Sequence, residues 1–325
     1  MVLAWPPVPE TLVSSPFPVN FGYSYFQVTN TQSVATPTNF QQYIQLPPQL
    51  TLNTFPLKFY ADPALTQPLY AWYETPTTVW VLLPNGIPAN SSINIYFNVG
   101  APDGVYTGMA PYLSSTYGAL DNGFSVFPTL YDNFVGTTLK SIWKPTGIGQ
   151  PIGSYSVNNG FTSTCTTGQA VALDTATQTY SLAGVYFESC IGPVTASAAS
   201  NNIDAFQVVN GVATHGSNTD SLLFGLVGQV QLYYTDSAGN NLADGGASIT
   251  LSNQHNILGV SANGSTVAGY VDYQTIASVS ETYVPSNIYF NAFLNYLSGS
   301  TSPTLYWTRI RAYPPNGVQP SVSIV

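Results

Sequence analysis

Short runs in which apolar and polar residues alternate are the feature that most restricts what this chain can fold into. Ile93, Ile95 and Phe97 alternate with Asn94 and Tyr96. Successive side chains of a β-strand point to opposite faces, so this pattern predicts strands with one buried face. Prolines, glycines and asparagines interrupt the runs about every eight to twelve residues, a spacing typical of β-sandwiches. We therefore predict an all-β fold.

The length of the chain and the position of its turns predict two β-sandwich domains. A chain of 325 residues has room for about two domains. The Pro-rich residues 1–20 indicate an extended arm that lies across a neighbouring domain or subunit, or a tail without regular structure. We expect the first sandwich within residues 21–122 and the second within residues 123–325. A turn at residues 121–123 marks the junction.

The last alternating run places the only two arginines of the chain on one face with aromatic residues. That face contains Trp307, Arg309, Arg311 and Tyr313. It predicts a glycan-stacking platform or a protein interface, because Trp, Tyr and Arg are enriched at binding hot spots. The alternative is a structural ion pair between Asp132 and Arg309 or Arg311. That pair would form if the last run paired with the strand that opens the second domain, as we expect.

The low charge of the chain excludes several classes of partner. Charged residues make up 6% of the sequence, against about 25% in typical soluble domains. The net charge of −9 argues against nucleic acid and against anionic membrane surfaces, which attract basic faces. No apolar run is long enough to span a membrane, so we expect no membrane insertion. Few contacts can be ion pairs, so protonation of the carboxylates at low pH would remove little stability. We therefore expect an acid-stable protein in an acidic extracellular medium. A neutral secreted β protein is the alternative.

The first residues contain no recognisable signal peptide. Residues 1–5 lack a basic segment and run directly into two prolines. We expect that a leader was removed before this numbering, or that the protein assembles in the cytoplasm and leaves inside a particle.

Two further features suit an extracellular protein. Cys165 and Cys190 predict a disulfide if the compartment is oxidising, and two reduced core thiols if it is not. Two sequons, which begin at Asn90 and Asn263, predict glycosylation in turn-like contexts.

Six short motifs stand out in the first half, at residues 39–44, 57–62, 69–74, 78–81, 87–89 and 93–97. Together they resemble an extracellular β-domain family of unknown function that occurs in archaeal and bacterial surface proteins. That family often precedes a concanavalin A-like lectin or glucanase sandwich. The resemblance covers about residues 20–105 and brings no catalytic residues with it.

The second half resembles that following domain. Residues 131–143 are similar to the opening of concanavalin A-like (jelly-roll) domains, and we expect residues 226–234 and 247–251 to form strands joined by a turn. The ending at residues 305–317 resembles the terminal strand of lectin-like surface proteins of archaea and their viruses. The resemblance implies a lectin-like scaffold.

The carboxylates of the chain do not show the spacing of a glycosidase. Glycoside hydrolysis needs two carboxyl groups across the bond that breaks. No glutamate has another carboxylate two to five residues away; the glutamates are Glu10, Glu74, Glu188 and Glu281. His215 and His255 indicate loop hydrogen bonds, and no Gly-x-Ser-x-Gly elbow is present. We expect no enzyme, although distant strands could still assemble a carboxylate pair.

A calcium ion is the one cofactor that the sequence suggests. Asp236, Asn240, Asn241 and Asp244 offer oxygen ligands on a single turn. A hairpin turn without a metal explains the same residues. We otherwise expect no cofactor.

The composition and the resemblance together predict a non-enzymatic structural or adhesive protein. We expect a subunit of a virion surface (capsid, turret or spike) of an archaeal virus, in a homo-oligomer that contacts host-surface glycans. The alternatives are a cellular surface adhesin or filament subunit, and a carbohydrate-binding module or degenerate glycosidase.

Overall fold

The fold is known from a computed structural model of the chain. It describes residues 25–50, 57–99, 123–147, 150–192, 201–204, 206–209, 221–226, 230–235, 241–247, 255–280, 282, 289–297 and 304–325. The expected arm at residues 1–20 and the expected boundary at residue 122 lie outside these ranges. None of the helices within them is long and apolar enough to cross a membrane.

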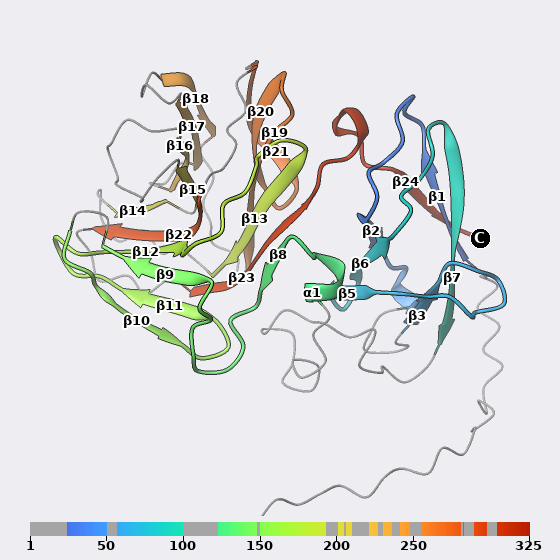
Figure 1. Ribbon diagram of the computed structural model, residues 1–325, viewed down its shortest axis with the longest axis horizontal. Helices are drawn as coiled ribbons and strands as arrows, with labels where there is room; N and C mark the ends of the chain where they lie inside the picture. Colours follow the sequence, from blue (N-terminus) through green and yellow to red (C-terminus); the bar gives the residue numbers. More distant parts are fainter. Residues whose placement is uncertain are drawn as a thin grey trace, which may run out of the picture.

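Two antiparallel sheets form the first sandwich (Figure 1). The larger sheet has the order β24 (Ser321–Ile324), β1 (Tyr25–Asn30), β7 (Ser91–Val99), β3 (Leu57–Tyr60) and β4 (Pro68–Leu69). The smaller sheet has the order β2 (Phe40–Gln45), β6 (Thr78–Leu83) and β5 (Ala71–Thr75). A short 3₁₀ turn, η1 (Pro48–Leu50), follows β2.

Two larger sheets form the second sandwich. One has the order β10 (Ser154–Val157), β11 (Phe161–Thr164), β23 (Thr304–Ala312), β13 (Val185–Ile191), β19 (Asn256–Ala262), β20 (Thr266–Val271) and β21 (Gln274–Ser280), with β8 (Leu130–Asp132) also beside β23. The other has the order β18 (Asn241–Ala247), β17 (Val230–Thr235), β16 (Ser221–Leu226), β15 (Phe206–Val209), β22 (Tyr289–Leu297), β12 (Ala170–Thr175) and β9 (Trp143–Thr146), with β14 (Asn201–Asp204) also beside β22.

The alternating runs bury their apolar faces between these sheets, as predicted. In the first sandwich Phe26 and Val28 of β1 pack with Val79 and Val81 of β6. In the second, sheet-to-sheet contact includes the rings of Phe187 and Phe290, whose centroids are 4.7 Å apart. Burial of such side chains contributes about 2 kcal/mol each. The prediction of an all-β fold with two sandwiches is therefore confirmed.

The last strand of the chain belongs to the first sandwich. β23 ends at Ala312, the chain passes through the turn η3 (Pro315–Gly317), and β24 then pairs antiparallel with β1. Phe26 lies opposite Ile324, and Val28 lies opposite Val322. The last residues of the expected second domain, in β24, therefore complete the larger sheet of the first sandwich.

The strand that opens the second sandwich pairs with β23, as predicted, but the predicted ion pair does not form. In this register Asp132 lies opposite Thr308, one residue away from Arg309. The Asp132 side chain instead accepts hydrogen bonds from Lys140 and from the Trp143 indole, both at 2.7 Å. Neighbouring positions on a strand face opposite ways, so Asp132 secures its own loop.

The predicted long strand at residues 226–234 is also corrected. Its two parts are β16, which ends at Leu226, and β17, which begins at Val230, and these residues pair across a hairpin. The returning strand is β18 at Asn241–Ala247, earlier than the expected residues 247–251. Leu226 and Val230 lie opposite each other in antiparallel pairing, so the chain reverses direction between them, which a single continuous strand cannot do.

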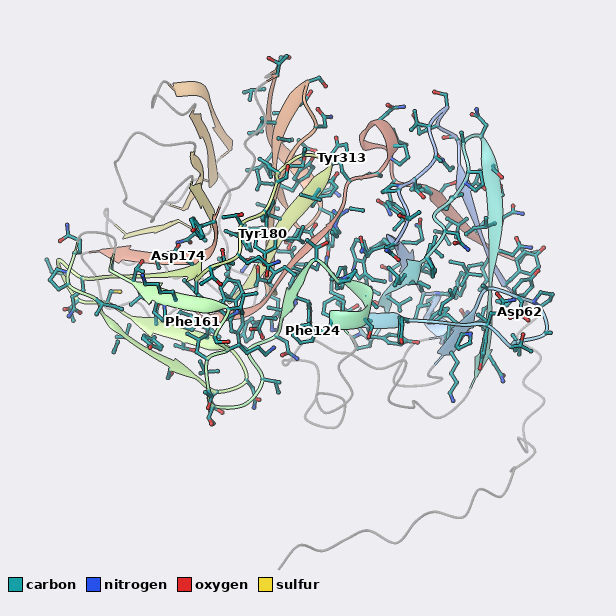
Figure 2. All side chains as sticks on the ribbon, viewed as in Figure 1. Asp62, Phe124, Phe161, Asp174, Tyr180 and Tyr313 are labelled. Atoms are coloured by element: carbon teal, nitrogen blue, oxygen red, sulfur yellow. The ribbon has the colours of Figure 1, made fainter. Side chains whose placement is uncertain are left out.

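A four-residue helix, α1 (Gly123–Val126), lies between the two sandwiches and precedes β8 (Figure 1). Figure 2 shows Phe124 of this helix at the junction, with Phe161 and Tyr180 in the second sandwich and Asp62 at the far end of the first. A Cβ atom on Gly123 would lie 2.2 Å from the Tyr131 ring. The junction therefore requires glycine at this position.

Replacing Gly123 with alanine should destabilise the protein. We expect Gly123→Ala to lower the free energy of unfolding by about 1–3 kcal/mol, because the Tyr131 ring must move within packed surroundings. Denaturant titration measures this change. The matched control is Gly192→Ala, whose added methyl would meet its nearest neighbour at 3.4 Å. Equal stability of the two variants would contradict the close approach.

Candidate functional site

The two sandwiches meet in a layer of aromatic side chains, here called the junction cluster. The sheet β2-β6-β5 packs Tyr73 and Val79 into the first sandwich and turns its other face to the second. On that face Trp72 and Trp80 pack with Trp307 of β23, and all three are at least 99% buried. The Trp72 and Trp307 rings meet edge to face at 5.5 Å. The middle sheet is thus buried on both faces.

Arg309 is the charged centre of the junction cluster. It is fully buried, and its Nε donates to a Glu188 oxygen at 2.7 Å across the β13–β23 pair. Its Nη2 lies 3.1 Å from a carboxylate oxygen of Glu74, which belongs to β5 of the first sandwich. Arg311 holds the second Glu188 oxygen at 2.7 Å. One guanidinium group therefore bridges carboxylates of both sandwiches.

Aromatic rings enclose this guanidinium group. The central carbon of Arg309 lies 4.4–5.2 Å from the centroids of Trp72, Trp80, Phe127 and Trp307. These distances are within the range of cation–π attraction. Nη1 of Arg309 has no hydrogen-bond partner among the described residues. Ring faces therefore replace part of its hydration.

The two buried glutamates have opposite pKa shifts. Burial alone would raise the pKa of Glu188, but the charges and hydrogen bonds of Arg311 and Arg309 outweigh it, so this pKa is lowered. Burial raises the pKa of Glu74, and Arg309 with hydrogen bonds from Tyr273 and Trp80 offsets this only in part. Glu188 is thus the stable anion of the pair, while the charge on Glu74 is costly.

Tyr273 joins the same network from the hairpin between β20 and β21. Its hydroxyl accepts a hydrogen bond from Arg309 Nη2 at 2.8 Å and donates one to a Glu74 carboxylate oxygen. The two turn residues, Asp272 and Tyr273, have φ angles of 47° and 66°. Such angles are uncommon for residues other than glycine, so this turn carries backbone strain. The hydrogen bond from the Ile257 amide to the Asp272 carboxylate supports it.

A groove opens to solvent beside the junction cluster, here called the aromatic groove. Its volume is about 420 Å³. Its aromatic and cationic walls are formed by Tyr43, Trp80, Tyr186, Tyr270, Tyr273 and Arg311. Asp272, Gln274, Thr275 and Gln319 add hydrogen-bonding groups to its lining. Flat rings beside amide, hydroxyl and carboxylate groups can stack on a sugar ring and bind its hydroxyls.

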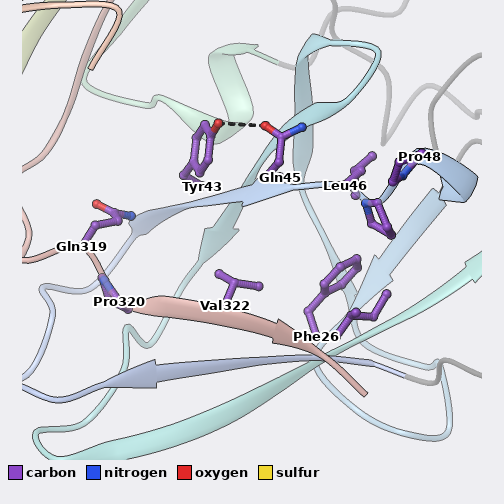
Figure 3. A pocket seen from close by; sticks show the side chains of 10 residues that line it. Phe26, Tyr43, Gln45, Leu46, Pro48, Gln319, Pro320 and Val322 are labelled. Atoms are coloured by element: carbon purple, nitrogen blue, oxygen red, sulfur yellow. Dashed lines mark hydrogen bonds between the residues drawn. The ribbon is translucent and has the colours of Figure 1, made fainter. Parts of the chain in front are cut away.

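A second cavity of about 540 Å³ lies in the first sandwich, between β24 and β2 (Figure 3). Figure 3 shows Phe26, Val322 and Pro320 facing Leu46 and Pro48 across it. We call it the edge cleft. Its walls are mainly apolar, which distinguishes it from the aromatic groove.

The predicted glycan face is largely inside the protein. Trp307 and Arg309 are buried in the junction cluster, so they contact the other sandwich of the same chain. Arg311 lines the aromatic groove, and its guanidinium lies 3.8 Å from the Tyr186 ring centroid. Tyr313, labelled in Figure 2, stacks on Tyr186 at 5.0 Å. The face is therefore an interface, but an intramolecular one.

The disulfide predicted between Cys165 and Cys190 is not formed. Both residues are buried thiols, and they pack in different clusters, Cys165 in the second sandwich and Cys190 in the junction cluster. Burial raises the pKa of Cys165 to about 11 and that of Cys190 well above its ordinary value. Both therefore act as small apolar core residues.

The structure shows the surroundings of both sequons and of two proposed calcium ligands. Asn90 and Asn263 lie in exposed turns, and the Asn263 side chain is hydrogen-bonded to Ser265, Thr266 and Tyr313. Of the proposed calcium ligands, Asn241 and Asp244 lie on β18, while Asp236 and Asn240 lie outside the described residues. His215 also lies outside them. In the described ranges no group of His, Cys, Asp and Glu could hold a metal ion.

Sequence reasoning missed Glu74, Glu188 and Tyr273. A signal for Glu74 was present: β5 and β6 have large side chains at successive positions, the pattern of strands buried on both faces. A glutamate within such a strand needs a cation. The structure thus unites two distant carboxylates, yet both are enclosed and held by arginines, unlike a glycosidase pair.

Comparison with known proteins finds a viral relative. No protein-family model matches the chain. Uncharacterized protein 562 of Sulfolobus islandicus rod-shaped virus 1 is 29% identical to it over 345 aligned residues. The alignment covers 90% of this chain and 57% of that protein. The chain therefore spans little more than half the length of the relative.

Solved structures with some likeness to the chain are lectins and glucanases. The Emp46p carbohydrate recognition domain in its potassium-bound form has a TM-score of 0.45 and is 12% identical to the chain. The match covers 55% of this chain and 94% of that domain. A Bacillus licheniformis β-glucanase has a TM-score of 0.42, with 16% identity and coverages of 56% and 97%. Laminarinase from Flavobacterium sp. UMI-01 has a TM-score of 0.45, with 13% identity and coverages of 56% and 98%. At such scores the likeness carries no argument about function.

Removing the charge of Glu188 should be far more costly than removing that of Glu74. We expect Glu188→Gln to lower the free energy of unfolding at pH 7 by about 3–5 kcal/mol, because it leaves buried arginine charge uncompensated. Glu74→Gln should cost less, because the charge it removes is disfavoured by burial.

The pH dependence separates the two variants. The lowered pKa of Glu188 adds stability above the ordinary glutamate value, and this is lost as the pH falls toward the lowered pKa. The deficit of Glu188→Gln should therefore shrink on acidification. The raised pKa of Glu74 costs stability as the pH rises through it. The stability of Glu74→Gln relative to the parent protein should therefore increase as the pH rises. Denaturant titrations between pH 3 and pH 7 test both slopes, and parallel profiles would refute the assignment.

Proposed function

We propose that this chain is a non-enzymatic structural and adhesive protein of a virion surface, which binds host-surface glycans in the aromatic groove. The groove carries the proposal. It combines three partly exposed tyrosines, Tyr43, Tyr270 and Tyr273, with hydrogen-bonding groups in its lining, from residues of both sandwiches. The viral relative supports a viral origin.

The character of the groove favours neutral sugars. Its arginine, Arg311, already pairs with Glu188 at 2.7 Å, so little positive charge remains for an acidic ligand. The net charge of −9 repels polyanionic chains over short distances. Tyrosine rings and side-chain amides suit the apolar faces and hydroxyls of neutral hexoses.

A binding role suits the groove better than hydrolysis. Hydrolysis would require two carboxyl groups on opposite sides of a bound glycosidic bond. Of the carboxylates described here, Glu74 and Glu188 are enclosed in the junction cluster, and Asp272 is the one on the groove wall. The Asp272 carboxylate already accepts a hydrogen bond from the Ile257 backbone amide at 2.8 Å.

The location of the protein is tested on particles. Mass spectrometry of purified virions should detect the chain, and antibodies against it should label intact particles without detergent. Absence from purified virions would overturn the viral structural role, and would leave the glycan-binding test below unaffected.

Binding is tested on a matched pair of tyrosines. Tyr270 is half-buried on the groove wall, while Tyr70 is 45% exposed and lies away from it. We expect Tyr270→Ala to weaken binding of a neutral oligosaccharide, found by glycan-array screening, about tenfold, which corresponds to about 1.4 kcal/mol. Tyr70→Ala should bind as the parent does.

Calorimetric titration with the selected oligosaccharide measures both affinities, and circular dichroism checks that each variant is folded. No saturable binding by the parent protein, or equal affinity of the folded Tyr270→Ala variant, would contradict the glycan-binding proposal.

A further inference from the structure

The edge cleft lies between the outer strands of two different sheets. β24 pairs with β1 and ends the larger sheet of the first sandwich, and β2 pairs with β6 and ends the smaller one. Both outer strands border the cleft, as Figure 3 shows. At one end the Gln42 side chain spans them, since its Nε2 donates to the carbonyls of Tyr43 and Pro320. The cleft has the position of a missing strand.

The walls of the cleft suit an extended apolar segment. Val322 and Ile324 of β24, Phe26 of β1 and Leu46 after β2 present apolar side chains to it. None of the residues that line it is charged. Proteins usually protect outer strands with charged residues, bulges or a covering element, because exposed backbone groups pair with other strands. β24 has no charged residue and no bulge in its register with β1.

The sequence that precedes β1 supplies a suitable segment. Residues 10–15 read Glu-Thr-Leu-Val-Ser-Ser and lie between Pro9 and Pro16. A residue before a proline favours the extended conformation, and threonine and valine favour strands. The run is six residues long, and β24 has four residues to pair with it. The segment matches the slot in length, and Leu12 and Val13 are its two apolar residues. Adjacent residues of an extended segment face opposite ways, so one of the two would point into the cleft.

The attachment point of this segment lies at the cleft. Tyr25, the first residue of β1, exchanges backbone hydrogen bonds with Val325 directly after β24. The residues between positions 15 and 25 can span about 30 Å when extended. A four-residue strand is about 13 Å long. Residues 10–15 can therefore reach the cleft of their own chain.

We propose that residues 10–15 dock into the edge cleft as an added strand on β24, in strand-addition geometry. Backbone hydrogen bonds to the outer edge of β24 would supply affinity, and alternate side chains would fill the apolar cleft. This site does not depend on glycan binding. We assign the segment to the cleft of its own chain, because its attachment point at Tyr25 lies beside the end of β24.

Cysteine cross-linking tests the added strand. Ser323→Cys places a thiol on an exposed position of β24. It is combined in the full-length chain with Leu12→Cys or with Val13→Cys. Adjacent strand residues face opposite ways, so one of the two pairs should cross-link at least about fivefold more than the other. The native thiols are buried with raised pKa values and should not compete.

The control replaces Ser323→Cys by Ala64→Cys, an exposed position in the loop between β3 and β4, at the opposite edge of the same sheet. Cross-linking with Ala64→Cys should be low and equal for both arm positions. A monomeric product on a non-reducing gel supports docking within the chain. A product that is dimeric alone would contradict this assignment and show exchange between copies.

Hydrogen exchange provides a readout without cysteines. Removal of residues 1–16 should speed amide exchange in the peptide that contains β24 about tenfold or more, while exchange in β13 stays unchanged. Cross-linking no stronger than the Ala64→Cys control, or unchanged exchange of β24 after the removal, would overturn the proposal.

Discussion

The buried guanidinium group of Arg309 is the interaction on which the arrangement of the two sandwiches depends. It binds Glu188 on the neighbouring strand and Glu74 on the other sandwich. Removing charges from water is expensive, and only close partners with good geometry repay it. Arg309 has two carboxylates, the Tyr273 hydroxyl and four aromatic rings. Such a demanding set of partners favours one relative placement of the sandwiches.

The surroundings of Arg309 also shape the surface next to it. Trp80 and Tyr273 contact the guanidinium group on one side and line the aromatic groove on another. The strained turn at Asp272 and Tyr273 places the Tyr273 side chain against both the guanidinium group and the aromatic groove. The groove wall is thus anchored in the junction cluster, so the site of the proposed glycan binding is held rigid. Gln319 lines both the aromatic groove and the edge cleft, which makes them neighbours on the molecule.

The sequence predicted the local features well because they depend on residues close together along the chain. Alternation identified the buried faces of β1 and β7, and the strand expected to open the second domain does pair with β23. It also drew attention to the run with Trp307 and Arg309. It failed where a partner had to be chosen: Asp132 was assigned to an arginine, although the register turns its side chain toward Lys140 and Trp143.

The sequence by itself determined the β-sandwich class, the faces of its strands and the scarcity of charge. Only the tertiary structure decided that Cys165 and Cys190 lie in separate clusters, that β24 returns to the first sandwich, and that Glu74 meets Arg309. The physical reason is that periodicity reports which side of a strand is buried, whereas ion pairs and disulfides depend on strand order and register. Those are set by packing between segments far apart in the chain.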